Sequence, residues 1–283
     1  MASMAQYGET QLLPRIRASE NSVASMKAES AIEFGMLSDA GRVRENNEDC
    51  VLVAPEMNLF VIADGMGGLA SGEIASRLTV DTVFAHCSEA EGDPSVALIG
   101  ERIEGVSPVL NRLASGVRLA NRVVHRQARR NSARQPMGST VVAIRIDERM
   151  SLAHVGDSRA YRLRADHLQQ LTQDHSFCAE QVRCGAMTEQ EAGKSNLRNI
   201  LTRAIGVEPE VEVDLSEEIV MDGDTLLLCS DGLTRELSEA QIAEVLIDAK
   251  HAQEAADRLV ILATEAGGRD NITAVVVRKP PKP

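Results

Sequence analysis

The chain has 283 residues, of which 30 are Lys or Arg and 42 are Asp or Glu, so its formal net charge is −12. An acidic chain with two Tyr, four Phe and no Trp lacks the basic surface that binds phosphate backbones and the aromatic side chains on which bases stack. Nucleic acid is therefore disfavoured as a partner, and a 43% hydrophobic content predicts a globular fold with an aliphatic core.

No part of the sequence predicts a membrane segment or an export signal. The longest apolar runs, such as 59–63 and 226–229, are the length of a strand, far short of the roughly 18–20 residues that span a bilayer. The first thirty residues carry Arg15, Arg17 and Lys27 and lack an apolar segment. The five cysteines form no Cys-x-x-Cys pair and no zinc-ligand spacing, which is typical of a reducing compartment. We expect a cytoplasmic protein with no membrane partner.

Residues 1–30 show no sustained periodicity and are expected to form a flexible tail, whereas 31–280 contain no linker or repeat and are expected to form a single domain. Short β-branched segments bounded by turn residues predict strands within that domain. These segments are 32–37, 50–54, 59–63, 140–146, 151–155, 160–164, 168–171, 211–215, 225–229 and 272–278. The short polar connections 147–149 and 164–167 predict antiparallel hairpins.

Four segments carry helix signals. Apolar residues three and four positions apart predict a helix over 71–87. A second helix begins with Ser107 as its N-cap and Pro108 as its first residue, and a third begins at a capping box that opens with Ser238. The fourth covers 253–266, which two glycines follow. Because strands and helices do not alternate strictly, the order favours antiparallel sheets with helices packed on their outer faces.

Several acidic residues stand at the ends of apolar strands. Asp64, Asp157 and Asp231 follow such strands, and Asp49 and Asp270 precede them. A strand that is apolar on successive residues is buried on both faces, so the acid at its tip is expected near the rim of the core. Acids gathered there would repel one another and resist ionisation, which a divalent cation relieves. All-oxygen ligands favour Mg²⁺ or Mn²⁺ over zinc.

Seven motifs spread over about residues 36–278 resemble, in the same order, those of the type 2C metal-dependent protein phosphatase family. They are Ser38-Asp39-x-Gly41-x-x-Arg44-x-x-Asn47-Glu48-Asp49, Ala63-Asp64-Gly65-x-Gly67-Gly68, Gly138-Ser139-Thr140, His154-Val155-Gly156-Asp157-Ser158-Arg159, Leu171-Thr172-x-Asp174-His175-Ser176, Ser230-Asp231-Gly232-Leu233 and Asp270-Asn271-Ile272-Thr273. The likeness is strongest to small bacterial members with no attached sensor or membrane segment.

The resemblance implies an α+β fold in four layers, a central antiparallel β-sandwich flanked by helices on both outer faces. It also implies a site for two Mn²⁺ or Mg²⁺ ions in a cleft at one edge of the sandwich. By match, Asp49, Asp64, Asp231 and Asp270 would be the carboxylates around the two ions. Gly65 would contribute its backbone carbonyl as a further ligand.

The same resemblance implies roles around the metal pair. Glu48 would hold a water bound to the metals, and Arg44 would grip the substrate phosphate, because its planar guanidinium suits two phosphate oxygens at once. Asp157, together with Asp231, would bind a weaker third ion. Residues 176–206 correspond to a variable flap beside the cleft.

The implied activity is hydrolysis of phosphoserine and phosphothreonine in proteins by direct attack of a hydroxide that bridges the two ions, without a covalent intermediate. The implied partners are phosphorylated proteins, including a cognate Ser/Thr kinase and its substrates, and we expect a monomer. Two alternatives remain open: a catalytically silent phosphoprotein-binding module on the same fold, and a phosphatase for small phosphorylated metabolites.

The chain departs from the family pattern at Met66. Many eukaryotic relatives have a His there that is a favoured proton donor to the leaving group, and Met cannot donate a proton. His154 and His175 are expected to make structural hydrogen bonds. The cysteines, including Cys50 beside the metal motif, are expected to be bystanders, because the implied mechanism needs no covalent intermediate.

Overall fold

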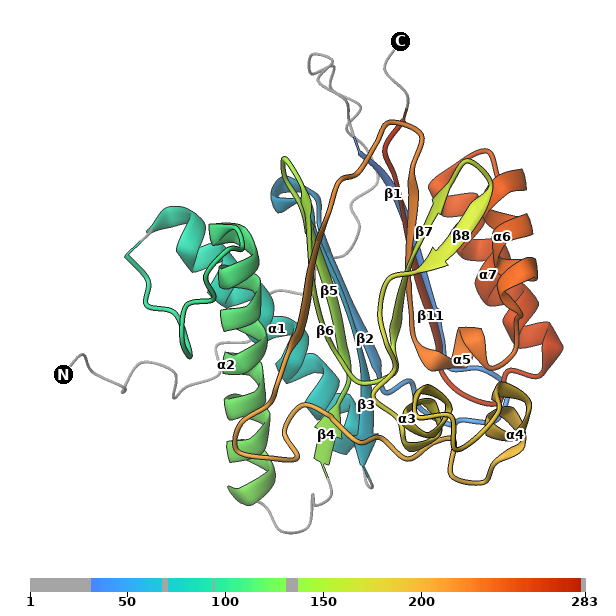
Figure 1. The fold of residues 1–283 in the computed structure, drawn as a ribbon, viewed down its shortest axis with the longest axis horizontal. Coiled ribbons are helices and arrows are strands. Elements are labelled where there is room, and N and C mark those ends of the chain that lie inside the picture. The colour runs from blue at the N-terminus through green and yellow to red at the C-terminus, as the bar shows by residue number, and fades with distance from the viewer. Residues whose placement is uncertain (1–31, 68–70, 94, 131–136, 281–283) are drawn as a thin grey trace.

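Two antiparallel sheets pack face to face in the computed structural model, which describes residues 32–67, 71–93, 95–130 and 137–280. Helices cover both outer faces, so the molecule has four layers (Figure 1). The predicted α+β fold with a central antiparallel sandwich and flanking helices is confirmed. None of the described helices is long and apolar enough to cross a membrane. The expected tail at 1–30 lies outside the described residues.

Five strands of the six-stranded sheet lie side by side in the order β2 (Asp49–Ala54), β3 (Leu59–Gly67), β5 (Val141–Ile146), β6 (Met150–Val155) and β9 (Asp214–Glu218). The sixth, β4 (Met137–Ser139), pairs with β3. The five-stranded sheet is formed, in order, by β1 (Glu33–Asp39), β11 (Ile272–Arg278), β10 (Thr225–Cys229), β7 (Arg159–Arg164) and β8 (His167–Gln170).

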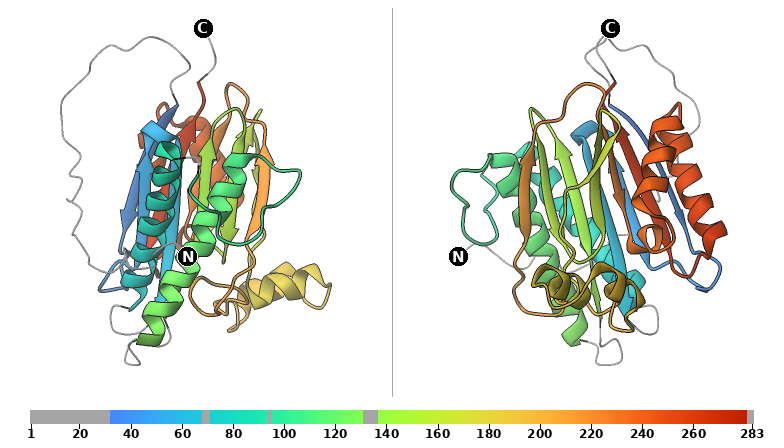
Figure 2. Two further views of the ribbon diagram at one scale, coloured as in Figure 1. Left: turned by 90° about the vertical axis from the view of Figure 1, so that its left-hand side faces the viewer. Right: turned by 45° about the vertical axis from the view of Figure 1, so that its right-hand side comes forward.

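The longer helices divide between the two outer layers. The six-stranded sheet is covered by α1 (Ser71–Gly92) and α2 (Pro108–Arg130), and the five-stranded sheet by α6 (Glu239–Asp248) and α7 (Ala252–Ala266). The shorter helices are η1 (Pro55–Met57), α3 (Phe177–Arg183), α4 (Glu189–Lys194) and α5 (Asp231–Thr234). Figures 1 and 2 place α3 and α4 at one end of the sandwich.

The uninterrupted apolar run of β3 follows from its central position. Phe60 and Ile62 belong to the core between the two sheets. Leu59, Val61 and Ala63 belong to the core between the six-stranded sheet and helices α1 and α2. Because alternate side chains of a strand point to opposite faces, both faces of β3 must be apolar.

The predicted helix starts and turns are confirmed. The Oγ atom of Ser107 accepts a hydrogen bond of 3.0 Å from the backbone N–H of Leu110, and Ser238 opens a capping box at the start of α6. Ala165 and Asp166 have φ of 48° and 62°, as a two-residue turn between antiparallel strands requires.

Three local predictions are corrected. The strand expected at 211–215 lies at Asp214–Glu218, because pairing with β6 begins at Asp214. Val211 and Val213 precede the strand, and with Leu215 they pack in the core that contains residues of α1 and α2. The first helix continues to Gly92. Strand β3 continues past its apolar run to Gly67, where it pairs with the unpredicted strand β4.

The start of α7 packs directly on the edge strand β1. The side chain of Gln253 accepts the N–H of Met36 (3.1 Å) and donates to its carbonyl (2.9 Å), which satisfies main-chain groups of an edge strand. A Cβ atom on Gly35 would lie 2.3 Å from the backbone of Gln253. Glycine at position 35 is therefore what allows this helix to approach the sheet.

We predict that Gly35→Ala destabilises the protein by about 1–3 kcal/mol, because the backbone of α7 has to move away from β1. Denaturant unfolding measures the change. Gly92→Ala is the matched control, since a Cβ atom there meets nothing within 4 Å. Equal stability of the Gly35 variant and the wild type would contradict the close approach.

Candidate metal centre

The residues predicted to form a site meet at one end of the sandwich, where strands of both sheets end near α5. A cavity of about 210 Å³ opens there. The predicted residues that line it are Arg44, Glu48, Asp64, Gly65, Asp157, Asp231 and Asp270. Asp49, the remaining one, lies opposite Asp64 in the register of β2 and β3. Residues far apart in the sequence thus converge on one cavity.

Asp49 links the two sheets. Its Oδ2 atom accepts hydrogen bonds of 2.7 Å from Ser230 and from Thr273, which belong to the five-stranded side. Its Oδ1 atom is buried and has no partner among the described residues. Burial raises the pKa of Asp49 to about 6. The pKa of Asp64 is raised well above its usual range, first by burial and then by the negative charge of Asp49.

Asp231 and Asp157 bring two more carboxylates to the cavity. Asp231 is the first residue of α5, directly after β10, and Asp157 follows β6; each is 8% exposed. Burial raises the pKa of both, and the charge of Asp157 raises that of Asp231 further. The Oδ1 atom of Asp231 has no partner in the described part of the chain. A Cβ on Gly232 would lie 2.0 Å from the carbonyl oxygen of Asn271, so α5 needs glycine there.

Asn271 holds the loop that carries Asp270 against the loop that precedes β2. Its side-chain oxygen accepts the N–H of Glu48 (2.8 Å). Its Nδ2 atom donates to the carbonyls of Ala40 (3.0 Å) and Asn46 (2.9 Å). Asn271 belongs to one of the seven motifs, but the sequence predicted no role for it. Its hydrogen bonds show that it positions the loops on both sides of the site.

Two glycines allow close approach around Glu48, Gly65 to the backbone and Gly72 to the side chain. The N–H of Gly65 donates to the carbonyl of Glu48 at 3.2 Å. A Cβ on Gly65 would lie 2.1 Å from the carbonyl oxygen of Gly72, and a Cβ on Gly72 would lie 2.6 Å from the Glu48 carboxyl carbon. Burial raises the pKa of Glu48, and the charge of Arg44 opposes that rise.

Two guanidinium groups partly neutralise the carboxylates. Arg44 donates from Nε and Nη2 to the two carboxylate oxygens of Asp270, at 2.9 and 3.0 Å, and its side chain is 51% exposed. Arg235 pairs with Asp231 and with Asp270 (3.0 Å), and lies 3.9 Å from Asp157. Arg235 was not among the predicted site residues. Its only local signal is that it follows Asp231 by four residues, a spacing common in ordinary helix ion pairs.

Met66 lines the same cavity on β3, opposite Gly138 of β4. A Cβ on Gly138 would lie 2.6 Å from the terminal methyl carbon of Met66, so the thioether packs closely against the β4 backbone. Met66 is thus a packing residue in the wall of the cavity.

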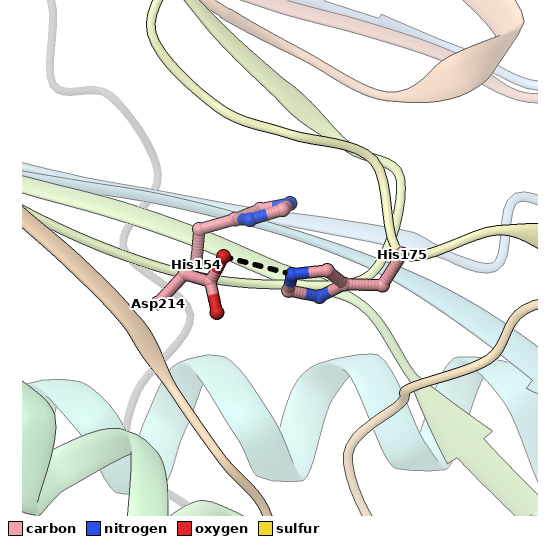
Figure 3. Close-up of side chains that lie close together, drawn as sticks. All are labelled: His154, His175 and Asp214. Carbon is pink, nitrogen blue, oxygen red and sulfur yellow. Dashed lines mark ion pairs between the residues drawn. The ribbon is translucent and has the colours of Figure 1, made fainter. Parts of the chain in front are cut away.

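Two histidines and an aspartate lie close together (Figure 3): His154 on β6, Asp214 on the neighbouring strand β9, and His175. His175 accepts the N–H of Gly156 through Nδ1 (3.0 Å) and contacts Asp214 through Nε2 (3.1 Å), so its predicted structural role is confirmed. The ring of His154 lies 4.7 Å from that of His175, but neither of its nitrogens has a partner among the described residues, so the same prediction is wrong for His154.

The charge state of this histidine pair follows from its burial. Burial lowers the pKa of His154 to about 4 and also lowers that of His175. The possible ligand atoms of His154, His175 and Asp214 lie within 4.8 Å of one another, a spacing that suits a metal ion. Arg203, which pairs with Asp214, already places a positive charge at this position.

Three of the cysteines, Cys50, Cys87 and Cys229, are not activated nucleophiles. Burial raises the pKa of Cys50 and of Cys87 to about 11 and that of Cys229 to about 12. A thiol with so high a pKa remains protonated at neutral pH, and a thiolate is the reactive form. The chemistry of the cavity therefore depends on oxygen and guanidinium groups.

Comparisons with known proteins agree with this geometry. Residues 41–272 match the family model described as Protein phosphatase 2C. The chain is 37% identical over 245 residues to the serine/threonine phosphatase stp of Listeria innocua, an alignment that covers 85% of this chain and 93% of that protein.

Solved structures show the same fold. The serine/threonine phosphatase PstP/Ppp of Mycobacterium tuberculosis superposes with a TM-score of 0.77 at 36% identity, over 88% of this chain and 99% of that one. A structure of the PstP catalytic domain in complex with two manganese ions gives a TM-score of 0.74 at 36% identity, over 87% and 97% of the two chains.

We predict that, without metal, Asp64→Asn is more stable than the wild type at neutral pH by about 1–4 kcal/mol, because it removes a charge from a crowded, buried position. A carboxyl whose pKa is raised on folding binds its proton more tightly in the folded state. Wild-type stability therefore falls as the pH rises from about 4, the ordinary Asp pKa, through the raised pKa values, of which Asp49 provides one at about 6.

The stability difference between Asp64→Asn and the wild type is thus expected to be small near pH 4 and to grow towards pH 7. Thermal unfolding in EDTA across this range measures it, with the exposed Asp147→Asn as a control for a general loss of negative charge. A difference that stays constant with pH would contradict the shifted pKa of Asp64.

Proposed function

The chain belongs to the protein phosphatase 2C family of metal-dependent Ser/Thr protein phosphatases, and on this premise we propose that it hydrolyses phosphoserine and phosphothreonine by direct attack of a water-derived nucleophile on phosphorus. The observation that carries the proposal is the convergence of buried carboxylates on one cavity with a half-exposed guanidinium, that of Arg44, in its wall. The expected substrates are phosphorylated proteins, which places the enzyme after a Ser/Thr kinase.

The donor set fits a pair of hard divalent cations. Asp49 and Asp231 each have a buried carboxylate oxygen that finds no partner within the described ranges, and burial together with neighbouring carboxylates raises the pKa of Asp64. Cations would relieve both the missing contacts and the repulsion, and all-oxygen ligands favour Mn²⁺ or Mg²⁺. We assign Asp49, Asp64, Asp231 and Asp270 as ligands, with the Gly65 carbonyl as a further one. The two manganese ions in the PstP complex support this assignment.

Two further acids have separate roles in the proposal. Asp157 and Asp231 line the same cavity and both lie near Arg235, and the charge of Asp157 raises the pKa of Asp231. Asp157 would share a weaker third ion with Asp231. The Glu48 carboxyl is held next to Gly72 at the start of α1, where it would orient a water molecule for the reaction.

Bound at these carboxylates, the cations would lower the pKa of water so that a hydroxide nucleophile forms near neutral pH, and would neutralise charge on the phosphate. Arg44 would bind phosphate oxygens of the substrate through the donors that Asp270 does not occupy, because its side chain is half exposed and its donors lie in one plane. Met66 has no proton to give, so the proton for the leaving serine or threonine oxygen must come from water or from another group.

We further propose that residues 176–206 form the flap beside this site. The segment contains α3 and α4, and bridges from Ser176 to Leu201 and from Ser139 to Ile205 fix its two ends. Asn199 and Leu201 line the carboxylate cavity, so a substrate held there would touch the segment.

The proposal is tested by phosphate release from phosphoserine and phosphothreonine peptides, from p-nitrophenyl phosphate and from sugar and nucleotide phosphates, each with Mn²⁺ and with EDTA. We expect metal-dependent turnover with a clear preference for the peptides. A lack of metal-dependent turnover on every substrate would favour a silent phosphoprotein-binding module, and a preference for the metabolites would favour a small-molecule phosphatase.

We predict that Asp231→Asn lowers kcat/KM on phosphopeptides by at least about a hundredfold, since it removes a ligand proposed for both the metal pair and the third ion. Asp157→Ala should lower it less, because only the third ion is affected. Titration of activity with Mn²⁺ measures both variants, and circular dichroism confirms that they fold. Equal losses would show that the two acids are not divided as proposed.

A further inference from the structure

A second, smaller cavity adjoins the carboxylate cavity, with a volume of about 120 Å³. Four arginines line it, Arg44, Arg198, Arg235 and Arg269, and we call it the arginine pocket. In a chain with a formal net charge of −12, such a concentration of guanidinium groups needs an explanation. Among the described residues, two carboxylates, those of Glu236 and Asp270, share the lining, so guanidinium groups outnumber carboxylates in its wall.

Two of the arginines belong to neither the carboxylate cluster nor the proposed phosphate clamp. Arg269 donates from Nε and Nη2 to the two oxygens of Glu236, at 2.9 and 2.8 Å, and its side chain remains 62% exposed. The side chain of Arg198, in the segment after α4, donates to the carbonyl of Gly193 at 3.3 Å, and in the part of the chain that the structure describes it makes no ion pair. Its charge is therefore available to an anion.

The arginine pocket shares a wall with the site of the proposed reaction. Arg44, Asn199, Arg235 and Asp270 line both cavities. Pockets for whole small molecules typically measure roughly 300–1,000 Å³, so the arginine pocket has room for one small group and not for a separate metabolite. Because the two cavities share these residues, a group that enters the arginine pocket can belong to a molecule that also occupies the neighbouring cavity.

We infer that the arginine pocket binds a second phosphoryl group of the same peptide, so that the enzyme prefers substrates phosphorylated at two nearby positions. The inference rests on the proposed function, because it places the reacting phosphate in the carboxylate cavity. A phosphoryl group offers three oxygens and close to two negative charges, which match several guanidinium groups at once. A single carboxylate offers two oxygens and one charge, and is expected to bind more weakly.

Three peptides of one sequence test the preference. One carries two phosphothreonines two residues apart, the second replaces the distal phosphothreonine with Asp, and the third replaces it with Thr. Positions i and i+2 of an extended chain lie on one face about 7 Å apart, which suits two adjoining cavities. We expect kcat/KM for the doubly phosphorylated peptide to exceed that for the Thr peptide by about tenfold, with the Asp peptide two- to threefold above the Thr peptide.

Arg198→Gln and Arg269→Gln identify the source of the preference. Each is expected to reduce it to about threefold or less, and to change kcat/KM for the singly phosphorylated peptide no more than the control variant does. Arg126→Gln is the matched control, because this exposed arginine on α2 lines a different cavity and its loss changes the net charge equally. A preference that weakens by the same amount in all three variants would be general attraction, and would overturn the assignment.

Binding separates a failure of this inference from a failure of the proposed function. Calorimetry with non-hydrolysable phosphonate versions of the singly and doubly modified peptides reports the arginine pocket even if no peptide is hydrolysed. A tighter complex with the doubly modified peptide that requires Arg198 supports the pocket. Equal affinity for both peptides would overturn it, whether or not the enzyme hydrolyses phosphopeptides.

Discussion

Carboxylate crowding is the constraint on which the rest of the site depends. Asp49, Asp64, Asp157 and Asp231 lose much of their contact with water and lie within range of one another, which raises the pKa of each. Charges in this arrangement destabilise a fold unless cations or hydrogen bonds compensate. The described residues supply only part of that compensation, chiefly through Arg235, and among them buried oxygens of two aspartates have no partner. Compensation by bound cations is what the arrangement requires.

The sandwich makes this crowding possible, because the site and the contact between the sheets coincide. Asp49 and Asp64 come from the six-stranded sheet, and Asp231 and Asp270 flank strands of the five-stranded sheet. Ser230 and Thr273 donate hydrogen bonds across to Asp49, and the side chain of Asn271 bonds to the loop before β2. Separation of the sheets would therefore disperse the carboxylates, so the apolar core between the sheets also maintains the geometry of the site.

The sequence predicts the strands well because most of them are apolar segments with clear turns, and it predicts acids at their ends. It does not show that these ends converge, since convergence depends on the order of strands in two sheets; only the family resemblance supplied that step. β4 was missed because Met137-Gly138-Ser139 has no β-branched residue and forms its ladder with the extension of β3, beyond the apolar run of that strand. Arg235 was missed because its partners at 157 and 270 are distant in sequence.

The positive groups at the site have a different distribution from the negative ones, and this determines what the site attracts. The aspartates are buried or half-buried at the sheet ends, whereas Arg44 is more than half exposed in the wall of the carboxylate cavity. An incoming phosphate therefore meets a guanidinium group before it comes near most of the carboxylates, which reduces the repulsion that a cluster of acids would exert on a dianion. Asp270 contacts Arg44 as well as Arg235, so it joins the buried acids to the exposed cations. An acidic protein can in this way bind acidic substrates, because the sign of the local field at the entrance differs from that of the molecule as a whole.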